Sequence, residues 1–193
     1  MKTKSLSAVL LAGGESRRMG SDKATAIFRD RPLWRNQLRI LQAVRPAEIL
    51  VSARTDPEWR PAQTIFVADV EPSIGPLSGI VAALRHMAGT HLLVLAIDLP
   101  MMTSAYLQML QDETKPGQGV VPVIGNRAEP IAAIYPAETN EFANAVAGVD
   151  HSLQTVVGEL ARANRVRLLP VAPQDEPLFQ NVNSQSDLKA LRR

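Results

Sequence analysis

The sequence predicts an α/β protein with three layers, α/β/α, and a mostly parallel central sheet. Short, continuous apolar runs recur along the 193 residues, with helical segments between them. Strands that are apolar at every position are typical of parallel sheets covered by helices on both faces. The most apolar run, at residues 91–97, is followed directly by Asp98. Ligands of such sheets bind beyond the carboxyl ends of the strands, so we expect the functional residues at that edge.

The first half of the chain alternates regularly between strands and helices. Strands are predicted at residues 6–12, 48–53, 64–68 and 91–97. One helix is predicted after Pro32, with its apolar positions at Leu33, Trp34, Leu38, Leu41 and Val44, and a second follows the loop from Asp69 to Pro76, with Leu77, Ile80, Val81 and Leu84. Pro32 suits the first turn of a helix because the N–H that it lacks would have no partner there.

The second half of the chain is less regular. Helices are predicted at residues 104–113, 138–147 and 152–163, and strands at residues 119–124, 131–135 and around 165–169. The proline-rich stretch from Pro170 to Pro177 is expected to be a rigid loop, because too little chain follows it to form another domain. Ser184 is the expected N-cap of a closing helix, with Asp187 in its first turn. We therefore expect a single domain over residues 1–193.

The composition of the chain excludes several classes of function. Hydrophobic residues make up 46% of the chain and charged residues 21%, as in ordinary globular proteins. The net charge is +2 and the arginines are scattered, whereas a nucleic-acid-binding protein gathers its basic residues on one face. No cysteine is present, which excludes disulfides, thiolate metal sites and cysteine nucleophiles. No apolar run reaches about 18 residues, the length of a membrane-spanning helix, and no secretory leader is visible, so we expect a cytoplasmic protein.

The first predicted strand runs directly into a loop rich in glycine and basic residues. Gly13 and Gly14 are adjacent, and Arg17, Arg18 and Lys23 follow them. The glycines permit a turn and leave backbone N–H groups free to point at an anion, and the three cations provide the charge that a polyphosphate needs. The sequence therefore predicts a phosphate site at the carboxyl end of the first strand.

Two well-known phosphate-binding loops do not match this segment. A Walker loop has four residues between its glycines and a Lys-Ser/Thr pair directly after them. Here five residues separate Gly14 from Gly20, and Lys23 comes later still. The dinucleotide fingerprint G-x-G-x-x-G is also absent. Neither a P-loop NTPase nor a Rossmann dehydrogenase is indicated.

Asp98 is a candidate metal ligand. A carboxylate that directly follows a buried strand emerges where the sheet meets solvent, and Mg²⁺ usually takes only one or two protein carboxylates together with water and phosphate oxygens. The alternative is that Asp98 caps the helix after Pro100. Near the end of the chain, Asn181 and Asn183 occupy alternate positions, so in an extended segment their amides point the same way; they either bind a ligand or form a turn before the last helix.

Four segments carry a family resemblance: LAGGESRRMGSDK at residues 11–23, GPLSG at 75–79, IDLP at 97–100 and QNVNS at 180–184. In their residues and in their order along the chain, they resemble the signature segments of the molybdenum cofactor guanylyltransferases. The resemblance implies a Rossmann-like nucleotidyltransferase fold and transfer of GMP from GTP to the terminal phosphate of molybdenum-molybdopterin. The products are the guanine dinucleotide form of the cofactor and pyrophosphate. The preference for GTP is implied by the resemblance alone.

The resemblance also implies roles for individual residues. Arg18, Lys23 and Asp98 are expected to be catalytic, and Asp98 is expected to hold Mg²⁺, with Mn²⁺ as an alternative. The expected nucleotide-binding residues are Leu11, Ala12, Gly13, Gly14, Lys23, Ser52, Asp69, Gly75, Pro76, Gly79, Asp98, Asn181 and Asn183. Ser52 stands where members of the family often have Asn, and its side chain is shorter.

Two other functions stay open. A related nucleotidyltransferase would use CTP on molybdopterin, or another NTP on a small phosphorylated acceptor. A carrier that binds a nucleotide or cofactor without turnover belongs to a different class, and the combination of Arg18, Lys23 and Asp98 disfavours it. The resemblance implies transient contacts with proteins that make the cofactor or insert it into molybdoenzymes; neither nucleic acid nor a membrane is an expected partner.

Overall fold

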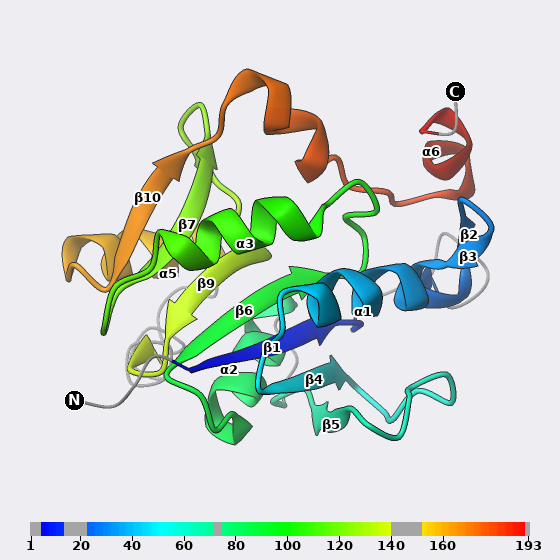
Figure 1. Cartoon of the computed structure of the whole chain (residues 1–193), viewed down its shortest axis with the longest axis horizontal. Coiled ribbons are helices and arrows are strands. Elements are labelled where there is room, and N and C mark those ends of the chain that lie inside the picture. Colours follow the sequence, from blue (N-terminus) through cyan, green and yellow to red (C-terminus); the bar gives the residue numbers. More distant parts are fainter. Residues whose placement is uncertain (1–4, 14–22, 72–74, 140–151, 192–193) are drawn as a thin grey trace.

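A computed structural model describes residues 5–13, 23–71, 75–139 and 152–191, and within them one sheet of eight strands forms the centre of the molecule (Figure 1). The strands are β1 (Leu6–Leu11), β4 (Glu48–Ala53), β5 (Ile65–Ala68), β6 (His91–Ala96), β7 (Gly119–Ile124), β8 (Arg127–Ala128), β9 (Ala132–Pro136) and β10 (Val166–Pro170). Their order is β10-β7-β9-β6-β1-β4-β5, with β8 paired to β7. Strands β6, β1, β4 and β5 are parallel to one another, as are β10 and β7. The prediction of a mostly parallel sheet is confirmed.

Strand β9 is antiparallel to both of its neighbours, β6 and β7. The chain passes from Ile124 at the end of β7 to Ala132 at the start of β9 through a turn at Gly125 and the short strand β8. A parallel connection needs about a dozen residues or more, so this short link reverses the chain direction. The reversal places Ile131 beside the end of β6, where its carbonyl accepts the N–H of Ala96 at 2.9 Å.

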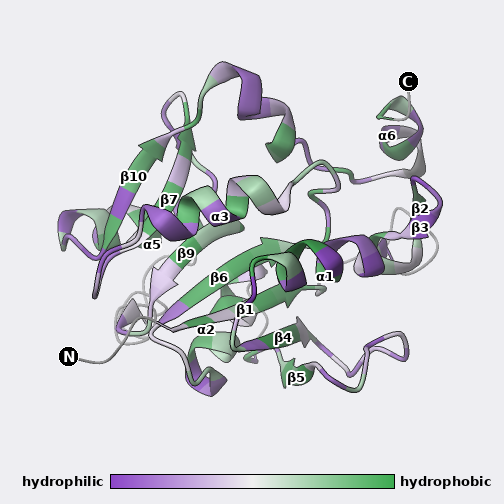
Figure 2. Ribbon diagram, viewed as in Figure 1, coloured by the Kyte–Doolittle hydropathy of each residue, from purple (hydrophilic) through white to green (hydrophobic). Residues whose placement is uncertain are grey.

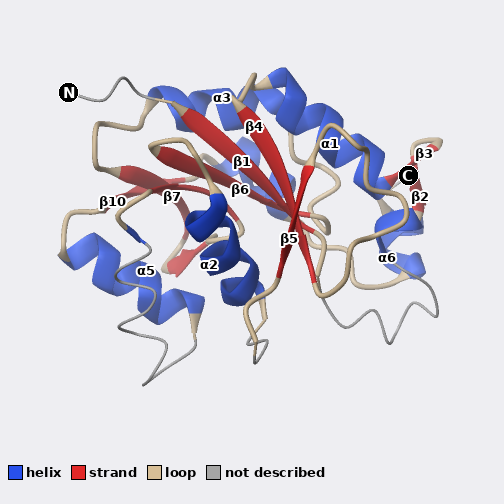
Figure 3. Ribbon diagram, turned by 90° about the horizontal axis from the view of Figure 1, so that it is seen from below, coloured by secondary structure: helices blue, strands red, loops and turns tan. Residues whose placement is uncertain are grey.

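Helices cover both faces of the sheet, as Figure 3 shows. The helices α1 (Leu33–Ala43) and α3 (Ser104–Asp112) lie on one face, and α2 (Pro76–His86) and α5 (Leu153–Arg162) lie on the other. Ala8 and Leu10 of β1 pack with the first pair, whereas Val9 and Leu11 pack with the second, as the alternation of side chains along a strand requires. Figure 2 shows the apolar character of the central strands, and every residue of β1 and β6 is buried. None of the helices in the described part of the chain is long and apolar enough to cross a membrane.

A short hairpin between the first loop and α1 was not predicted. It consists of β2 (Ile27–Phe28) and β3 (Arg31–Pro32) and follows the 3-10 helix η2 (Lys23–Thr25). Its turn residues, Arg29 and Asp30, have φ angles of 47° and 64°. Two-residue hairpin turns of this kind usually contain Asn-Gly or Asp-Gly, so the Arg-Asp sequence carried no turn signal.

The proline-rich stretch near the C-terminus also differs from the prediction. Instead of a loop, the chain forms the 3-10 helix η3 (Pro173–Phe179), a conformation that suits the φ angle of proline. Phe179 at its end is buried and packs edge-on against Tyr106 of α3, with 5.3 Å between the ring centroids. The helix predicted at residues 138–147 falls largely outside the described residues.

The closing helix α6 (Gln185–Ala190) begins as predicted. Ser184 Oγ accepts the N–H of Asp187 at 3.2 Å, and Asp187 Oδ2 accepts the N–H of Ser184 at 2.9 Å, which together form a capping box. The backbone N–H of Asn183 donates to the same carboxylate at 2.7 Å, and these hydrogen bonds lower the pKa of Asp187. The capping box therefore fixes the backbone of the segment that carries Asn183.

Candidate active site

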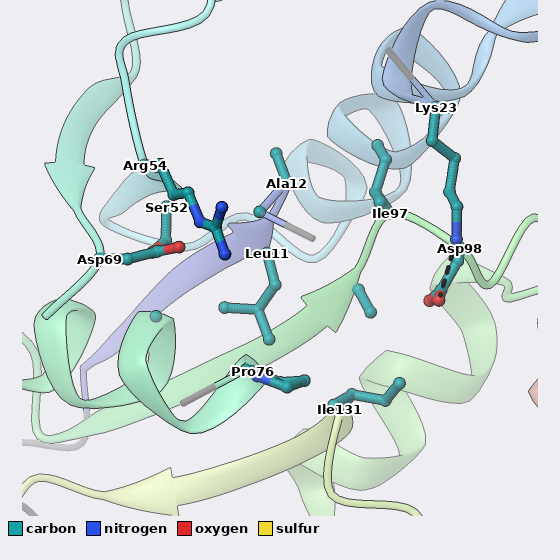
Figure 4. Close-up of a pocket in the computed structure, with 14 residues that line it drawn as sticks. Leu11, Ala12, Lys23, Ser52, Arg54, Asp69, Pro76, Ile97, Asp98 and Ile131 are labelled. Atoms are coloured by element: carbon teal, nitrogen blue, oxygen red, sulfur yellow. Dashed lines mark hydrogen bonds and ion pairs between the residues drawn. The ribbon is translucent and has the colours of Figure 1, made fainter. Parts of the chain in front are cut away.

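A cleft of about 420 Å³ opens at the carboxyl ends of β6, β1, β4 and β5 (Figure 4). Its lining residues come from these strand ends, from the start of α2, from η2 and from the residue before β9. They are Leu11, Ala12, Gly13, Lys23, Ser52, Arg54, Asp69, Gly75, Pro76, Gly79, Ala96, Ile97, Asp98 and Ile131. The cleft lies at the edge of the sheet where the sequence predicted a ligand site.

Most of the residues predicted for the site lie together in this cleft. They are Leu11, Ala12, Gly13, Lys23, Ser52, Asp69, Gly75, Pro76, Gly79 and Asp98. Asn183 does not line the cleft but contacts Lys23, which does. Asn181 is exposed and does not line it. Arg18 and Gly14 lie outside the described residues, so their roles stay predictions.

Lys23 and Asp98 meet at one end of the cleft. The ammonium nitrogen of Lys23 lies 3.6 Å from Asp98 Oδ2 and donates a hydrogen bond to Asn183 Oδ1 at 3.2 Å. The three residues come from η2, from the end of β6 and from the segment before α6, so distant parts of the sequence converge here. Because Lys23 is held by two oxygens and is only 17% exposed, it presents a positive charge that needs little reorganisation to bind an anion.

The carboxylate of Asp98 is largely shielded from solvent. Its side chain is 21% exposed, and its Oδ1 atom is buried without a hydrogen-bond partner in the described part of the structure. Burial raises the pKa of Asp98, and the charge of Lys23 offsets part of that rise. The alternative role as a helix cap is wrong, because the hydroxyl of Thr103 caps α3 by accepting the N–H of Tyr106 at 3.2 Å. Asp98 therefore keeps an oxygen available for a ligand.

Two other segments hold the backbone on either side of Asp98. The buried amide of Gln37, in α1, donates to the carbonyl of Leu99 at 2.7 Å and to that of Ala96 at 3.4 Å. The N–H of Val182 donates to the carbonyl of Asp98 at 2.9 Å. Sequence reasoning missed Gln37; an amide on the apolar face of a predicted helix is the signal that could have found it.

Ser52 and Asp69 lie toward the other end of the cleft. The hydroxyl of Ser52 donates to Asp69 Oδ1 at 2.5 Å. Two glycines let the backbone approach this pair closely: a Cβ on Gly13 would lie 2.6 Å from Asp69 Oδ2, and a Cβ on Gly79 would lie 2.7 Å from Ser52 Oγ. Neither position has room for a side chain without displacing the pair.

The expectation that both loop glycines offer free amides is wrong for Gly13. Its N–H donates to the carbonyl of Ser52 at 3.2 Å, and the N–H of Ala12 donates to the same oxygen at 2.8 Å. The backbone after β1 is therefore tied to β4 rather than directed at an anion. Gly13 contributes to the site through its lack of a side chain beside Asp69.

Sequence reasoning missed part of the cleft lining, namely Arg54, Ala96, Ile97 and Ile131. Arg54 follows β4 directly, so its place after a buried strand could have pointed to it. The place of Ile131 beside β6 depends on the antiparallel direction of β9.

The site suits a divalent cation held by few protein ligands. The described residues contain no group of three or more His, Cys, Asp and Glu side chains that could hold a metal by themselves. Mg²⁺ bound together with a nucleotide usually needs only one or two carboxylates, since phosphate and water oxygens provide the remaining ligands. The unpartnered Oδ1 of Asp98 fits that arrangement.

Comparisons with known proteins identify the family of this chain. The family described as "MobA-like NTP transferase domain" matches residues 8–166. A probable molybdenum cofactor guanylyltransferase of Opitutus terrae is 31% identical over 194 residues, covering 97% of this chain and 95% of that protein. Among solved structures, molybdopterin-guanine dinucleotide biosynthesis protein A of Archaeoglobus fulgidus has a TM-score of 0.75 at 22% identity, with 95% of each chain covered. Rv0371C of Mycobacterium tuberculosis, solved in complex with manganese, has a TM-score of 0.63 at 16% identity and covers 88% of this chain and 89% of its own. The chain belongs to the MobA-like NTP transferase family.

Proposed function

We propose that this protein transfers GMP from GTP to the terminal phosphate of molybdenum-molybdopterin and releases pyrophosphate. The observation that carries the proposal is the cleft itself, in which Lys23 and Asp98 lie at one end and Ser52 and Asp69 toward the other. The relative from Opitutus terrae, 31% identical over nearly the whole chain, is named for guanylyl transfer to the molybdenum cofactor.

The chemistry requires alignment and charge neutralisation rather than a general base. The terminal phosphate of molybdopterin is already anionic at neutral pH, so its oxygen can attack the α-phosphorus of GTP without losing a proton. The bond between the α-phosphorus and the bridging oxygen to the β-phosphate breaks, and pyrophosphate leaves. Lys23 neutralises charge on the leaving group, and a fixed cation of this kind typically contributes about 10²-fold or more to the rate. Arg18 is proposed to share that role.

Asp98 is the proposed holder of Mg²⁺, with Mn²⁺ as an alternative. When bound, the cation would supply charge neutralisation for the phosphate groups during the transfer. Asp98 positions that charge, because hydrogen bonds from Gln37 and Val182 fix the backbone around it. Burial raises the pKa of Asp98, and the positive charge of Lys23 offsets part of that rise.

We propose that residues 1–193 act as one nucleotidyltransferase domain and that the protein works in the cytoplasm. Its partners are then the two small-molecule substrates, together with transient contacts to proteins that make the cofactor or insert it into molybdoenzymes.

A nucleotide panel tests the proposed function. Purified protein is incubated with molybdenum-molybdopterin and with GTP, CTP, ATP or UTP, and pyrophosphate release is measured with Mg²⁺, with Mn²⁺ and with a chelator. We expect release with GTP that requires both the acceptor and a divalent cation. A preference for CTP would point to the cytidylyl reaction, and GTP binding without any release would point to a carrier; either result would contradict the proposal.

A further inference from the structure

Arg54 is a charged residue of the cleft that the proposed reaction does not yet use. It directly follows β4, and its guanidinium group points toward the space beside Leu11 and Ala12 in Figure 4. Arg54 enters the cleft from the end of β4, and Asp69 enters it from the end of the neighbouring strand β5. Ala53 is paired with Ala68, so Arg54 and Asp69 occupy the next positions on β4 and β5, and the N–H of Asp69 donates to the carbonyl of Ala53 at 3.0 Å.

The order of the strands separates Arg54 and Asp69 from the end that holds Lys23 and Asp98. Asp98 follows β6, and the order across the sheet is β6, β1, β4, β5. Neighbouring strands lie about 4.8 Å apart, so the end of β4 is roughly 10 Å, and that of β5 roughly 14 Å, from the end of β6. Figure 4 shows the two groups on opposite sides of the cavity. If the phosphates bind at Lys23 and Asp98, the base of the nucleotide therefore extends toward Arg54 and Asp69.

The polar groups at this end match the edge of guanine. Guanine presents two acceptors, O6 and N7, next to the donors N1–H and N2–H₂, and Arg pairs with O6 and N7 through two parallel hydrogen bonds. A carboxylate offers only acceptors and suits the donor side of the base. Ser52 is not available to donate to O6 or N7 of the base, because its hydroxyl already donates to Asp69 Oδ1 at 2.5 Å.

We propose that Arg54 reads guanine by donating hydrogen bonds to O6 and N7, and that it thereby makes the site prefer GTP to ATP. This inference rests on the proposed function, which supplies the nucleotide. In adenine the exocyclic group beside N7 is an amino donor, so it meets the N–H groups of Arg54 with the wrong polarity.

The loop that carries Arg54 is held by contacts that do not involve Arg54. Arg60 forms two hydrogen bonds with the carboxylate of Asp56, at 2.6 and 2.7 Å, and donates to the carbonyl of Thr64 at 2.5 Å. The indole ring of Trp59 stacks on that of Trp34, in α1, with 5.5 Å between the ring centroids. A substitution at Arg54 is therefore expected to leave the loop in place and to change the cleft alone.

The test pairs a change in the protein with a change in the ligand. Dissociation constants are measured by calorimetry in Mg²⁺ buffer for GTP, ATP and 7-deaza-GTP, which lacks the N7 acceptor. The proteins are the wild type, Arg54→Ala, Arg54→Lys and the control Arg39→Ala, which removes an exposed arginine of α1 outside the cleft. Pyrophosphate release with GTP and acceptor is measured for each protein, and circular dichroism checks the fold.

We expect the wild type and Arg39→Ala to bind 7-deaza-GTP about tenfold more weakly than GTP, the typical effect of losing a hydrogen bond to a charged group. Arg54→Ala should bind GTP about tenfold more weakly and should no longer distinguish the two nucleotides. Its KM for GTP should rise with little change in kcat. Arg54→Lys should recover only part of the affinity, because an ammonium group cannot form the paired contact.

The outcomes separate this inference from the proposed function. If the wild type releases no pyrophosphate from GTP, the proposed function fails. If the wild type is active but Arg54→Ala still distinguishes GTP from 7-deaza-GTP as the wild type does, the assignment of Arg54 is overturned. The same conclusion follows if the active wild type binds GTP and 7-deaza-GTP equally well.

Discussion

Lys23 Nζ lies 3.6 Å from Asp98 Oδ2, so the cation proposed to face the polyphosphate and the carboxylate proposed to hold the metal share one end of the cleft. Each charge compensates the other in a place with little solvent. Without Lys23, the buried Asp98 carboxylate loses its nearest cation, whereas without the Asp98 charge Lys23 still donates to Asn183. Both substitutions should lower activity, but only the loss of Lys23 leaves a buried charge without compensation.

Replacing Lys23 with Ala should lower kcat about 10²-fold or more, because a preorganised positive charge on the leaving group is lost. The pKa of Asp98 should rise further without the nearby ammonium group, so the remaining activity should shift to higher pH. Pyrophosphate release measured between pH 5 and 9 checks both effects, and Lys189→Ala, on the exposed side of α6, is the matched control. Near-normal turnover in Lys23→Ala would remove this residue from the mechanism.

Replacing Asp98 with Asn should abolish metal-dependent nucleotide binding but stabilise the metal-free protein near neutral pH. Burial raises the pKa of Asp98 in the folded state, so the folded protein favours the protonated carboxyl. The stability that the protonated form provides is present below the ordinary pKa of Asp, about 3.9, and is lost as the pH rises through the raised value. An uncharged amide avoids that loss.

Thermal unfolding of metal-free wild type and Asp98→Asn from about pH 4, near the ordinary pKa of Asp, to about pH 8 measures the effect. The melting temperature of the variant should exceed that of the wild type most at pH 8, and the difference should shrink as the pH falls. If the variant is less stable than the wild type at pH 8, burial of the ionised Asp98 carboxylate does not destabilise the folded protein. An unchanged Mg²⁺ dependence of GTP binding would remove it from the metal site.

The two asparagines near the C-terminus should differ in importance. Asn183 accepts a hydrogen bond from Lys23 at 3.2 Å, whereas Asn181 is exposed and does not line the cleft. Asn183→Ala should therefore lower turnover by roughly tenfold, since the ammonium group of Lys23 loses a partner that orients it. Asn181→Ala should stay within about twofold of the wild type, as exposed positions usually do. Equal losses in steady-state assays of the two variants would contradict this distinction.

Two glycines in helices should respond to Ala in opposite ways. In an open position Ala favours a helix over Gly by about 1 kcal/mol, and Gly158 in α5 is open, since an added Cβ meets only Arg162 Nη2 at 4.0 Å. At Gly79 in α2 the added Cβ would lie 2.7 Å from Ser52 Oγ and 3.0 Å from Leu11 Cδ2, so Gly79→Ala should destabilise the protein by about 1–3 kcal/mol. It should also raise the KM for GTP, because Ser52 and α2 must move apart. Urea unfolding of the two variants measures the contrast, and a stabilised Gly79→Ala would refute the close approach.

Gln37 should act on Asp98 through the backbone. Gln37→Leu removes the amide that donates to the carbonyls of Leu99 and Ala96. The Leu99 carbonyl keeps the N–H of Met102 as a partner at 3.1 Å, so we expect a loss of about 1 kcal/mol, the usual net contribution of a hydrogen bond. Beyond lower stability, we expect a higher Mg²⁺ concentration for half-maximal activity, because the carboxylate of Asp98 is less firmly placed. The Mg²⁺ titration distinguishes a role in placing Asp98 from a role in stability alone. If the variant loses stability but keeps the wild-type Mg²⁺ requirement, Gln37 stabilises the fold and does not position Asp98.

The apolar runs of the sequence predicted most strands of the sheet. Strands that are buried on both faces consist of continuous apolar residues, so β4 and β7 have the bounds predicted for them. Asp98 could be placed for the same reason, because a carboxylate after such a strand has to emerge at the edge of the sheet. The direction of β9 and the hairpin of β2 and β3 could not be predicted, since a short link and two non-glycine residues with positive φ carry no local signal.

Site residues that directly follow a strand or lie in a glycine turn could be predicted from the sequence. Contacts that depend on how strands and helices pack together could not. The hydrogen bond between Ser52 and Asp69 links residues at the ends of two paired strands, and Gly79 of α2 approaches both of them. These contacts form only when β4, β5 and α2 pack together. The N–H of Gly13 is taken by the carbonyl of Ser52, a partner that no local pattern reveals. Arg54 directly follows a buried strand, but only the pairing of β4 with β5 places it next to Asp69.

The most direct test of the account is a crystal structure of the wild-type protein with Mg²⁺ and a GTP analogue that cannot be cleaved between the α- and β-phosphates. We predict phosphate oxygens within hydrogen-bond distance of Lys23, the cation on a carboxylate oxygen of Asp98, and the base toward Asp69 and Arg54. A nucleotide bound outside this cleft, or one whose base lies against Lys23 and Asp98, would contradict it.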